Sequence, residues 1–281
     1  MERDFYERGG YVSDLACERR RADLSVEGVE RTTEYNDGFS WERIRISSTE
    51  GARAIERPMG CYDTLTLPRM DKLSEEDIDD AGNEIAKELC LAVERLGIYP
   101  ERLLIVGLGN RDLTPDSIGP RVASAINATM HLPDYDRGLF YELECSEIAV
   151  LTPGVSAQSG MDSCELICAV CDRIEPDAVI AVDALASASP SRLGTTVQIS
   201  DTGIFPGSGI GASHGEVTVK TTGVPVIAIG VPTVINARAF AHGGGDIGLE
   251  GMFVSPKEID GIASAASRII AIGINQAFGI I

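Results

Sequence analysis

The sequence predicts an α/β fold with a mostly parallel or mixed central sheet and helices on both faces. Four short runs rich in β-branched residues, LLIVGLG, AVIAVDA, TTVQIS and VPVIAIGVP, follow one another between residues 103 and 232. Glycine-rich turns and helical stretches separate them, and strands that alternate with helices are typical of such a sheet. Reacting groups in these sheets gather at the carboxyl ends of strands, so acidic residues near those ends are the first candidates for a site.

The part of the chain before these runs has a different pattern. Residues 15–70 are predicted to form an N-terminal extension with short strands, because Trp41 to Ile46 alternates apolar and charged residues. A long amphipathic helix follows, which Ser74 begins and Gly97 ends. Residues 71–281 are then the core of a domain that spans 15–281.

Composition narrows the classes of protein to which the chain can belong. The 281 residues are 44% hydrophobic, which is enough for one large domain. The N-terminus alternates acidic and basic residues where a signal peptide needs an apolar stretch, and the longest apolar runs are too short or interrupted to cross a bilayer. We therefore expect a cytoplasmic protein with no membrane association. A net charge of -19 also argues against direct binding of nucleic acid.

The seven cysteines indicate reduced thiols rather than disulfides or a metal site. Their number is odd, and most of them stand singly among apolar residues. Cys164, Cys168 and Cys171 have spacings of four and three, which place them on one helical face, but no second ligand cluster follows. Buried thiols explain them better than a metal, and we expect neither a metal nor a cofactor.

Asp116 lies in a turn that only begins like a dinucleotide-binding loop. Gly107 and Gly109 follow a strand, but Asp112 takes the place of the third glycine, and prolines break the helix that would bind pyrophosphate. Pro115 precedes Asp116 and a Gly-Pro pair follows it, so the backbone holds this carboxylate at a fixed position. The alternative is that Asp116 caps the helix that begins at Ile118 or Pro120.

Asp183 is the second candidate carboxylate; it ends the apolar strand within AVIAVDALAS, and we expect it just past the strand end. An ionised group there needs a partner or a function, and capping of the next turn is the alternative. Two aspartates at strand ends of one sheet can converge and share one proton. Such a pair activates water for attack on a peptide bond.

A nucleophilic serine is a weaker candidate for the chemistry. Ser208 and His214 lie in a glycine-rich loop, residues 202–215, which is either functional or a plain surface connection. No Gly-x-Ser-x-Gly motif surrounds Ser208, and His131 and His242 have no ligand spacing.

Seven segments in order along the chain resemble the germination protease family. They are YVSDLACE, IVGLGNRDLTPDSIGP, TPGVSAQSGMDS, VDALAS, QISDTGIFPGSGIG, GVPVIAIGVPTVINA and VSPKEID, between Tyr11 and Asp260. The resemblance implies an aspartic endopeptidase that degrades small acid-soluble spore proteins during germination. The essential aspartates of the family lie in the TPD and VDA segments, which are Asp116 and Asp183 here.

The same resemblance implies a homo-oligomer, a tetramer in this family, located in the forespore or spore core. It also implies an inactive precursor that removes its own N-terminal peptide. The spore proteins are cut where an acidic residue precedes an apolar residue, Ala, any residue and Glu, and the stretch from Ser13 to Glu18 repeats that pattern. We expect a propeptide, residues 1–14, cut between Asp14 and Leu15. The alternative is a helix that Ser13 or Asp14 caps.

The germination proteases are similar in fold to the hydrogenase maturation proteases, which leaves a rival interpretation open. In those enzymes two acidic residues and a histidine help to hold nickel, so His214 becomes a candidate third ligand of a metal-recognising processing protease. GASHGEVT, residues 211–218, lacks the basic residues expected after the glycine-rich loop. A non-catalytic binding protein of the same fold is the third alternative.

Overall fold

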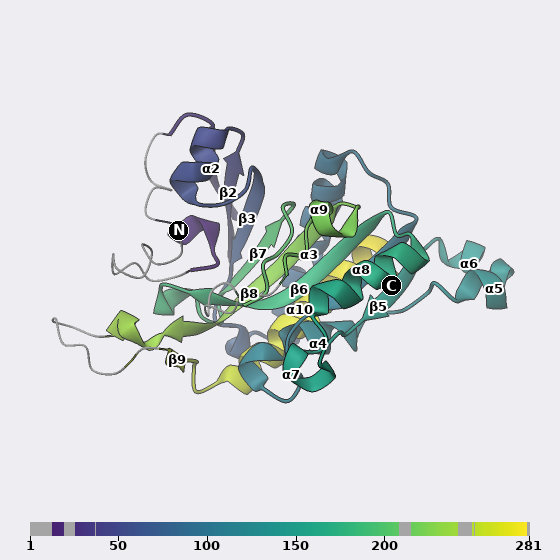
Figure 1. Cartoon of the computed structure of the whole chain (residues 1–281). Helices are drawn as coiled ribbons and strands as arrows, with labels where there is room; N and C mark the ends of the chain where they lie inside the picture. Colours follow the sequence, from purple (N-terminus) through teal and green to yellow (C-terminus); the bar gives the residue numbers. More distant parts are fainter. Residues whose placement is uncertain are drawn as a thin grey trace.

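A computed structural model describes residues 13–19, 26–36, 38–207, 215–240, 249 and 251–279. Within these residues, nine strands form one mixed sheet in the order β1-β2-β3-β7-β8-β6-β4-β5, and β9 pairs with β8 (Figure 1). The strands are β1 Val29–Asn36, β2 Phe39–Ile46, β3 Gly60–Thr66, β4 Arg102–Gly107, β5 Glu147–Leu151, β6 Ala178–Ser187, β7 Thr196–Ser200, β8 Val226–Asn236 and β9 Phe253–Val254.

The sheet has a parallel half and an antiparallel half. β5, β4, β6 and β8 run parallel, whereas β7 pairs antiparallel with β8 and continues through β3 to β2 and β1. The four runs predicted as strands are β4, β6, β7 and β8, and Trp41 to Ile46 lies in β2. The predicted mixed sheet is confirmed.

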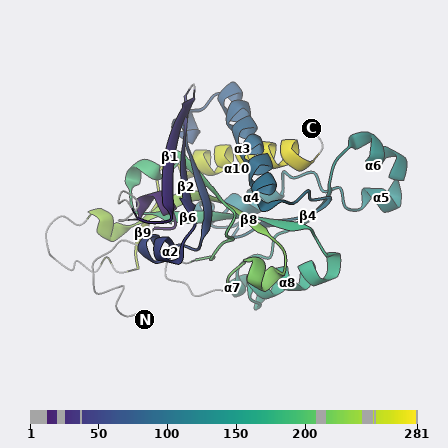
Figure 2. The same cartoon turned by 90° about the horizontal axis from the view of Figure 1, so that it is seen from above.

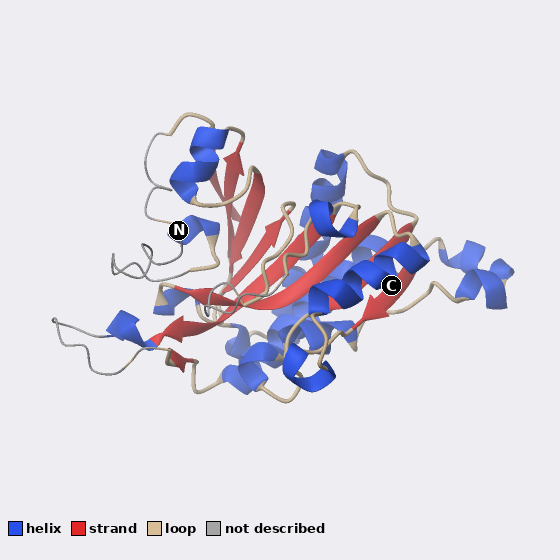
Figure 3. Cartoon of the chain, viewed as in Figure 1, coloured by secondary structure: helices blue, strands red, loops and turns tan. Residues whose placement is uncertain are grey.

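Helices cover both faces of the sheet, as Figures 2 and 3 show. Helices α3, α4 and α10 pack on one face, and α8 packs with α9 on the other. The α-helices are α2 Thr49–Ile55, α3 Glu75–Leu96, α4 Ile118–Ala123, α5 Leu132–Tyr135, α6 Arg137–Leu143, α7 Ser156–Ser159, α8 Ser163–Ile174, α9 Val219–Thr222 and α10 Ile259–Phe278. Short 3-10 helices are η1 Ala16–Glu18, η2 Met70–Lys72, η3 Thr114–Asp116, η4 Pro190–Arg192 and η6 Ala237–Phe240.

The predicted long helix is α3, and its two ends explain its length. The Ser74 hydroxyl accepts a hydrogen bond from the Asp77 amide, and the Asp77 carboxylate accepts one from the Ser74 amide. Gly97 ends the helix in the left-handed region with φ 67°. In the described part of the chain, no helix combines the length and apolarity needed to cross a bilayer.

Candidate functional site

The site lies where β4 ends and β6 continues. The pairing of these parallel strands stops at Gly107 and Val182, and the loop after β4 turns back so that the Leu108 amide donates to the Val182 carbonyl over 2.8 Å. The backbone of Gly119 touches both of these groups, because a Cβ there would lie 2.2 Å from the Leu108 oxygen and 2.5 Å from that of Val182. This close packing brings the loop that carries Asp116 against β6.

Asp116 is the last residue of η3, and its own loop holds its carboxylate. Its Oδ2 accepts a hydrogen bond from the Asn110 amide over 2.8 Å. Gly109 makes this turn with φ 107°, a conformation that favours glycine. The alternative that Asp116 caps the next helix is wrong, because Ser117 is the N-cap of α4 and makes no side-chain cap bond.

Asp183 is the sixth of the ten residues of β6, so the expectation that it lies past the strand end is wrong. β6 continues to Ser187 because β8 pairs with it beyond the point where β4 stops. The alternative that Asp183 caps a following turn is wrong for the same reason. Its side chain is 5% exposed, and Oδ1 accepts a hydrogen bond from the Ala184 amide over 2.9 Å.

Electrostatics couples the two aspartates. Burial raises the pKa of Asp183 well above its ordinary value, and the charge of Asp116 raises it further. Burial also raises the pKa of Asp116, while the Asn110 amide opposes this shift because it favours the ionised form. The two environments therefore push Asp183 further toward its protonated form than Asp116.

The segment from Ser13 to Arg19 lies against the part of β6 that β4 leaves unpaired. The Asp14 amide donates to the Ala186 carbonyl, and the Ala186 amide donates to Asp14 Oδ2, both over 2.9 Å. Leu15 and Ala16 are fully buried. The alternative that Ser13 or Asp14 caps a helix is wrong, because Leu15 is the N-cap of η1 and makes no side-chain cap bond.

Gln198 contacts the chain on both sides of the Asp14–Leu15 peptide bond. Its Oε1 accepts from the Ala16 amide over 2.8 Å, and its Nε2 donates to the Asp14 carbonyl over 3.4 Å. Gly230 of β8 pairs with both Asp183 and Gln198, so these residues form one row across the sheet. A Cβ at Gly230 would lie 2.3 Å from Leu185 Cδ1, so the Leu185 side chain packs over Gly230 and would have to move for a larger residue there.

Arg57 is the basic group beside Asp14. Its Nη2 donates to the Ser13 carbonyl over 2.8 Å and lies 3.9 Å from Asp14 Oδ1. Neither Arg57 nor Gln198 was among the residues predicted for the site. A glutamine in the middle of the buried strand TVQIS was a signal for the second, because buried polar groups need partners. No pattern in the sequence marked the first.

The remaining candidates lie apart from this edge or outside the described residues. Ser208, His214 and His242 belong to the latter group. Cys164 and Cys171 are buried on α8, and burial raises the pKa of each thiol to about 11. Where the chain is described, no group of three or more His, Cys, Asp and Glu side chains is arranged to hold a metal ion.

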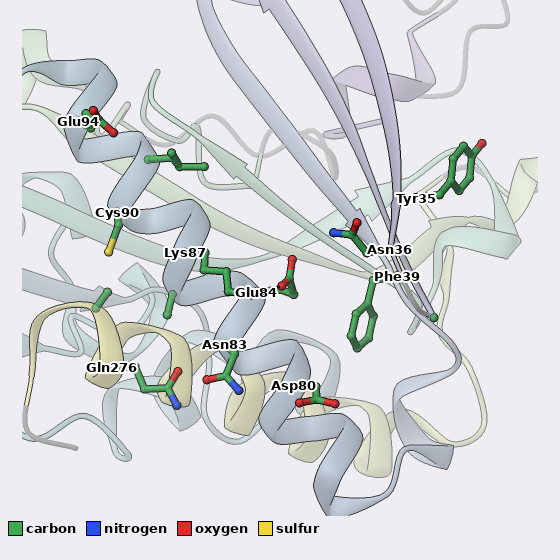
Figure 4. Close-up of a pocket in the computed structure, with 14 residues that line it drawn as sticks. Tyr35, Asn36, Phe39, Asp80, Asn83, Glu84, Lys87, Cys90, Glu94 and Gln276 are labelled. Carbon is green, nitrogen blue, oxygen red and sulfur yellow. Dashed lines mark hydrogen bonds and ion pairs between the residues drawn. The ribbon is translucent and has the colours of Figure 1, made fainter.

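A groove lies between the β1–β2 hairpin and the outer face of α3. Its volume is about 1460 Å³, and Tyr35, Phe39 and Lys87 line it with acidic residues of α3 (Figure 4). Lys87 pairs with Glu84 over 2.7 Å. Neither candidate aspartate nor the segment from Ser13 to Arg19 lines this groove, so it is separate from the site at β6.

Comparison with known proteins gives one consistent family. A family model described as "Germination protease" matches residues 11–249. The germination protease of Caldanaerobacter subterraneus is 40% identical over 237 residues, which cover 83% of this chain and 72% of the relative. That of Clostridium acetobutylicum is 32% identical in an alignment 313 positions long, which covers 94% of this chain and 94% of the relative. The [NiFe] hydrogenase maturation protease HycI from Thermococcus kodakarensis is a structural neighbour with a TM-score of 0.37 and 20% identity, over 68% of this chain and 98% of that one.

Proposed function

Because this chain belongs to the germination protease family and is therefore a peptidase, we propose that it is an aspartic-type endopeptidase that acts on small acid-soluble spore proteins during germination. The observation that carries the proposal is the position of the chain's own Asp14–Leu15 bond, between Gln198 and the strand that bears Asp183. The matched range, residues 11–249, includes this bond and both aspartates.

The two aspartates divide the chemistry in this mechanism. Asp116, whose carboxylate accepts an amide hydrogen bond, is the ionised base that takes a proton from water. The resulting hydroxide attacks the carbonyl carbon of the acidic residue, and Asp183 supplies a proton so that the peptide nitrogen leaves as an amine. Burial and the neighbouring negative charge keep the pKa of Asp183 high enough for this role.

Gln198 stabilises the charge that develops on the carbonyl oxygen. Its Nε2 donates to that oxygen of Asp14, and its Oε1 fixes the backbone two residues later. A preorganised neutral donor aimed at a developing oxyanion lowers the barrier without a change of protonation. Arg57 orients Asp14, the residue before the cut bond. Its guanidinium donates to the Ser13 carbonyl and lies beside the Asp14 carboxylate.

We further propose that the chain is made as a self-processing zymogen with residues 1–14 as its propeptide. In this proposal the segment from Ser13 to Arg19 occupies the position of a substrate, so another polypeptide binds there only when it displaces this segment. Residues 1–12 of the propeptide lie outside the described part of the chain.

Replacement of each aspartate tests the assignment of the chemistry. Asp116→Asn and Asp183→Asn keep the side-chain shape and remove acid–base function, so each should lower the rate of cleavage of a small acid-soluble spore protein by roughly 10²–10⁴-fold. Asp172→Asn, on the exposed side of α8, is the matched control and should keep the full rate. Near-normal cleavage by Asp183→Asn, with an unchanged circular dichroism spectrum, would contradict the dyad.

The same assay separates the rival functions. A chelator should leave the activity unchanged, and a loss that nickel or zinc restores would favour a metal-recognising processing protease. If the chain neither removes its own residues 1–14 nor cuts any spore protein once they are removed, a non-catalytic binding protein is favoured.

The chain is also proposed to act as a homo-oligomer, a tetramer, in the spore core. The 44% hydrophobic content supports this assembly, because a large sheet with many apolar strands leaves apolar surface to cover. Light scattering at micromolar concentration tests it, and a stable monomer would contradict it.

A further inference from the structure

We propose that the turn from Ser187 to Ser189 is a carboxylate-binding subsite, which selects a glutamate at the fourth position after the cleaved bond of a substrate. In the uncut chain, Glu18 occupies this subsite. The proposal rests on the proposed function, because it takes the bond between Asp14 and Leu15 as the one that is cut.

The Glu18 carboxylate is held by hydroxyl and amide groups that converge on its two oxygens. Oε1 accepts from the Ser187 hydroxyl over 2.8 Å and from the Ser189 amide over 3.0 Å. Oε2 accepts from the Ala188 amide over 2.7 Å and from the Ser13 hydroxyl. Two backbone amides and a hydroxyl of one short turn therefore point at one acidic side chain.

The chemistry of these donors distinguishes glutamate from its amide. An ionised carboxylate only accepts hydrogen bonds, so both of its oxygens match the N–H and O–H groups of the turn. A glutamine side chain would place its NH₂ group against one set of donors and leave a buried amide N–H without an acceptor. The subsite is thus selective for the charge of the residue as well as its length.

The fold fixes this turn relative to the dyad. Ser187 is the last residue of β6 and is 1% exposed, so it lies on the same strand as Asp183, four residues further along. The next turn is also ordered, because the Ser189 hydroxyl accepts from the Ser191 amide at the start of η4. The distance between the subsite and the reacting groups is therefore set by a strand rather than by a loop.

Occupation by Glu18 has a consequence for substrates that come from outside. The subsite cannot hold Glu18 and the glutamate of another polypeptide at once, and the attached segment competes at a high effective concentration. Cleavage between Asp14 and Leu15 leaves Glu18 on the enzyme side of the cut. Release of the stretch from Leu15 to Glu18 is therefore a separate step that must precede turnover of external substrates.

Peptide binding to inactive protein tests the subsite without any cleavage. The full chain with Asp183→Asn, alone and combined with Glu18→Gln, is titrated against a fluorescent peptide that copies residues 13–19 and against the same peptide with glutamine in place of its glutamate. We expect the glutamate peptide to bind at least tenfold more tightly than the glutamine peptide. It should also bind at least tenfold more tightly to the Glu18→Gln protein than to the protein that keeps Glu18.

Substitutions in the turn assign the effect to named groups. Adding Ser187→Ala should reduce the preference for the glutamate peptide several-fold. The matched control is Ser191→Ala, which removes a hydroxyl of the neighbouring η4 turn that does not touch Glu18. Equal affinity for the two peptides, no measurable binding of either, or a preference that Ser187→Ala leaves unchanged would overturn the subsite.

Failure of the subsite and failure of the proposed function give different results. If the two aspartates are not the catalytic residues, the Asp183→Asn protein still cleaves its substrate. The cleavage assay detects this result, and the peptide titration does not. A wrong subsite appears as lost discrimination between the peptides while both aspartates remain essential for cleavage. Circular dichroism of each variant checks that the fold is kept, and Asp116→Asn replaces Asp183→Asn if the latter does not fold.

Discussion

At the scale of single residues, the environments of Asp116 and Asp183 differ in a way that supports the roles proposed for them. Asp183 lies within a buried strand, where an ionised carboxylate is costly. Asp116 lies in a loop whose Asn110 amide donates to it, which lowers the cost of ionisation. In the proposed mechanism a shared proton therefore resides on Asp183, and Asp116 acts as the base.

The pH dependence of cleavage follows from these two shifts. Both pKa values lie above the ordinary value of an aspartate, and that of Asp183 is raised more strongly. As pH falls through the pKa of Asp116 the base is protonated and the rate decreases. As pH rises through the pKa of Asp183 the acid loses its proton and the rate decreases again. We expect a bell-shaped profile of self-cleavage, with mild acidification favourable relative to alkaline conditions, measured by mass spectrometry over the pH range in which the chain stays folded. A rate that still increases with pH up to the onset of alkaline unfolding would contradict this assignment.

Substitution of Gln198 should affect the chemical step more strongly than substrate binding. Gln198→Leu removes the donor to the carbonyl oxygen, so kcat should decrease by roughly 10²–10³-fold. KM should change less, because the backbone pairing with Ala186 and the contacts of Arg57 remain. Gln276→Leu, on α10 beside the separate groove, is the control and should have unchanged kinetics. A change confined to KM would show that Gln198 only binds the chain.

At the scale of elements, a cluster of two buried carboxylates and two partly exposed arginines joins the N-terminal strands to α3. Arg95 contacts Asp63 over 2.7 Å and Glu88 over 2.9 Å, and Arg43 contacts the same two carboxylates from β2. Asp63 is 2% exposed and Glu88 is 1% exposed. The two arginines balance the two carboxylates, which is a condition for such groups to be buried at all.

This cluster makes the stability of the fold depend on pH. Burial first, and then the charge of Glu88, raise the pKa of Asp63 to about 7. Between the unfolded pKa of roughly 4 and this value, the folded state holds a proton that the unfolded state has lost. The contribution of Asp63 to the free energy of unfolding is therefore fully present below the unfolded pKa and is lost as pH rises toward 7.

Asp63→Asn should remove this dependence. Between pH 5 and pH 7, the unchanged chain should lose roughly 1–3 kcal/mol more of its free energy of unfolding than the Asp63→Asn protein loses. Urea denaturation at several pH values measures the difference. Asp79→Asn, on the exposed side of α3, is the control, and identical slopes for all three proteins would contradict the role of Asp63.

The elements also show which features could be predicted from sequence. Local patterns predicted α3, whose capping box and terminal glycine are neighbours in sequence, and the strands with continuous apolar runs. The position of Asp183 within β6 was not predictable, because it depends on β4 stopping at Gly107 while β8 continues. The row through Gly230 that aligns Asp183 with Gln198 likewise arises from strand register, which no local pattern encodes.

At the scale of the whole molecule, the segment from Ser13 to Arg19 connects distant parts of the sheet. Asp14 pairs with β6, and Leu15 packs among apolar side chains beneath β4 and β6. Ala16 packs with Ile44 and Ile46 of β2. Because the chain holds this segment on several of its own strands, the proposed dyad would act on the Asp14–Leu15 bond of the same molecule.

The order of the self-cleavage reaction follows from this arrangement. If the bond is cut by the dyad of its own chain, release of residues 1–14 is first order, and its half-life does not change over a hundredfold range of protein concentration. Mass spectrometry should find Leu15 as the new N-terminus.

Mixing two proteins tests whether the cut is made within one molecule. In a dilute mixture, the unchanged chain should be processed while the Asp116→Asn protein stays intact, because the Asp116→Asn protein lacks its base. A half-life that shortens in proportion to concentration would show that one molecule cuts another, and equal processing of Asp116→Asn incubated alone would show that a contaminating protease makes the cut.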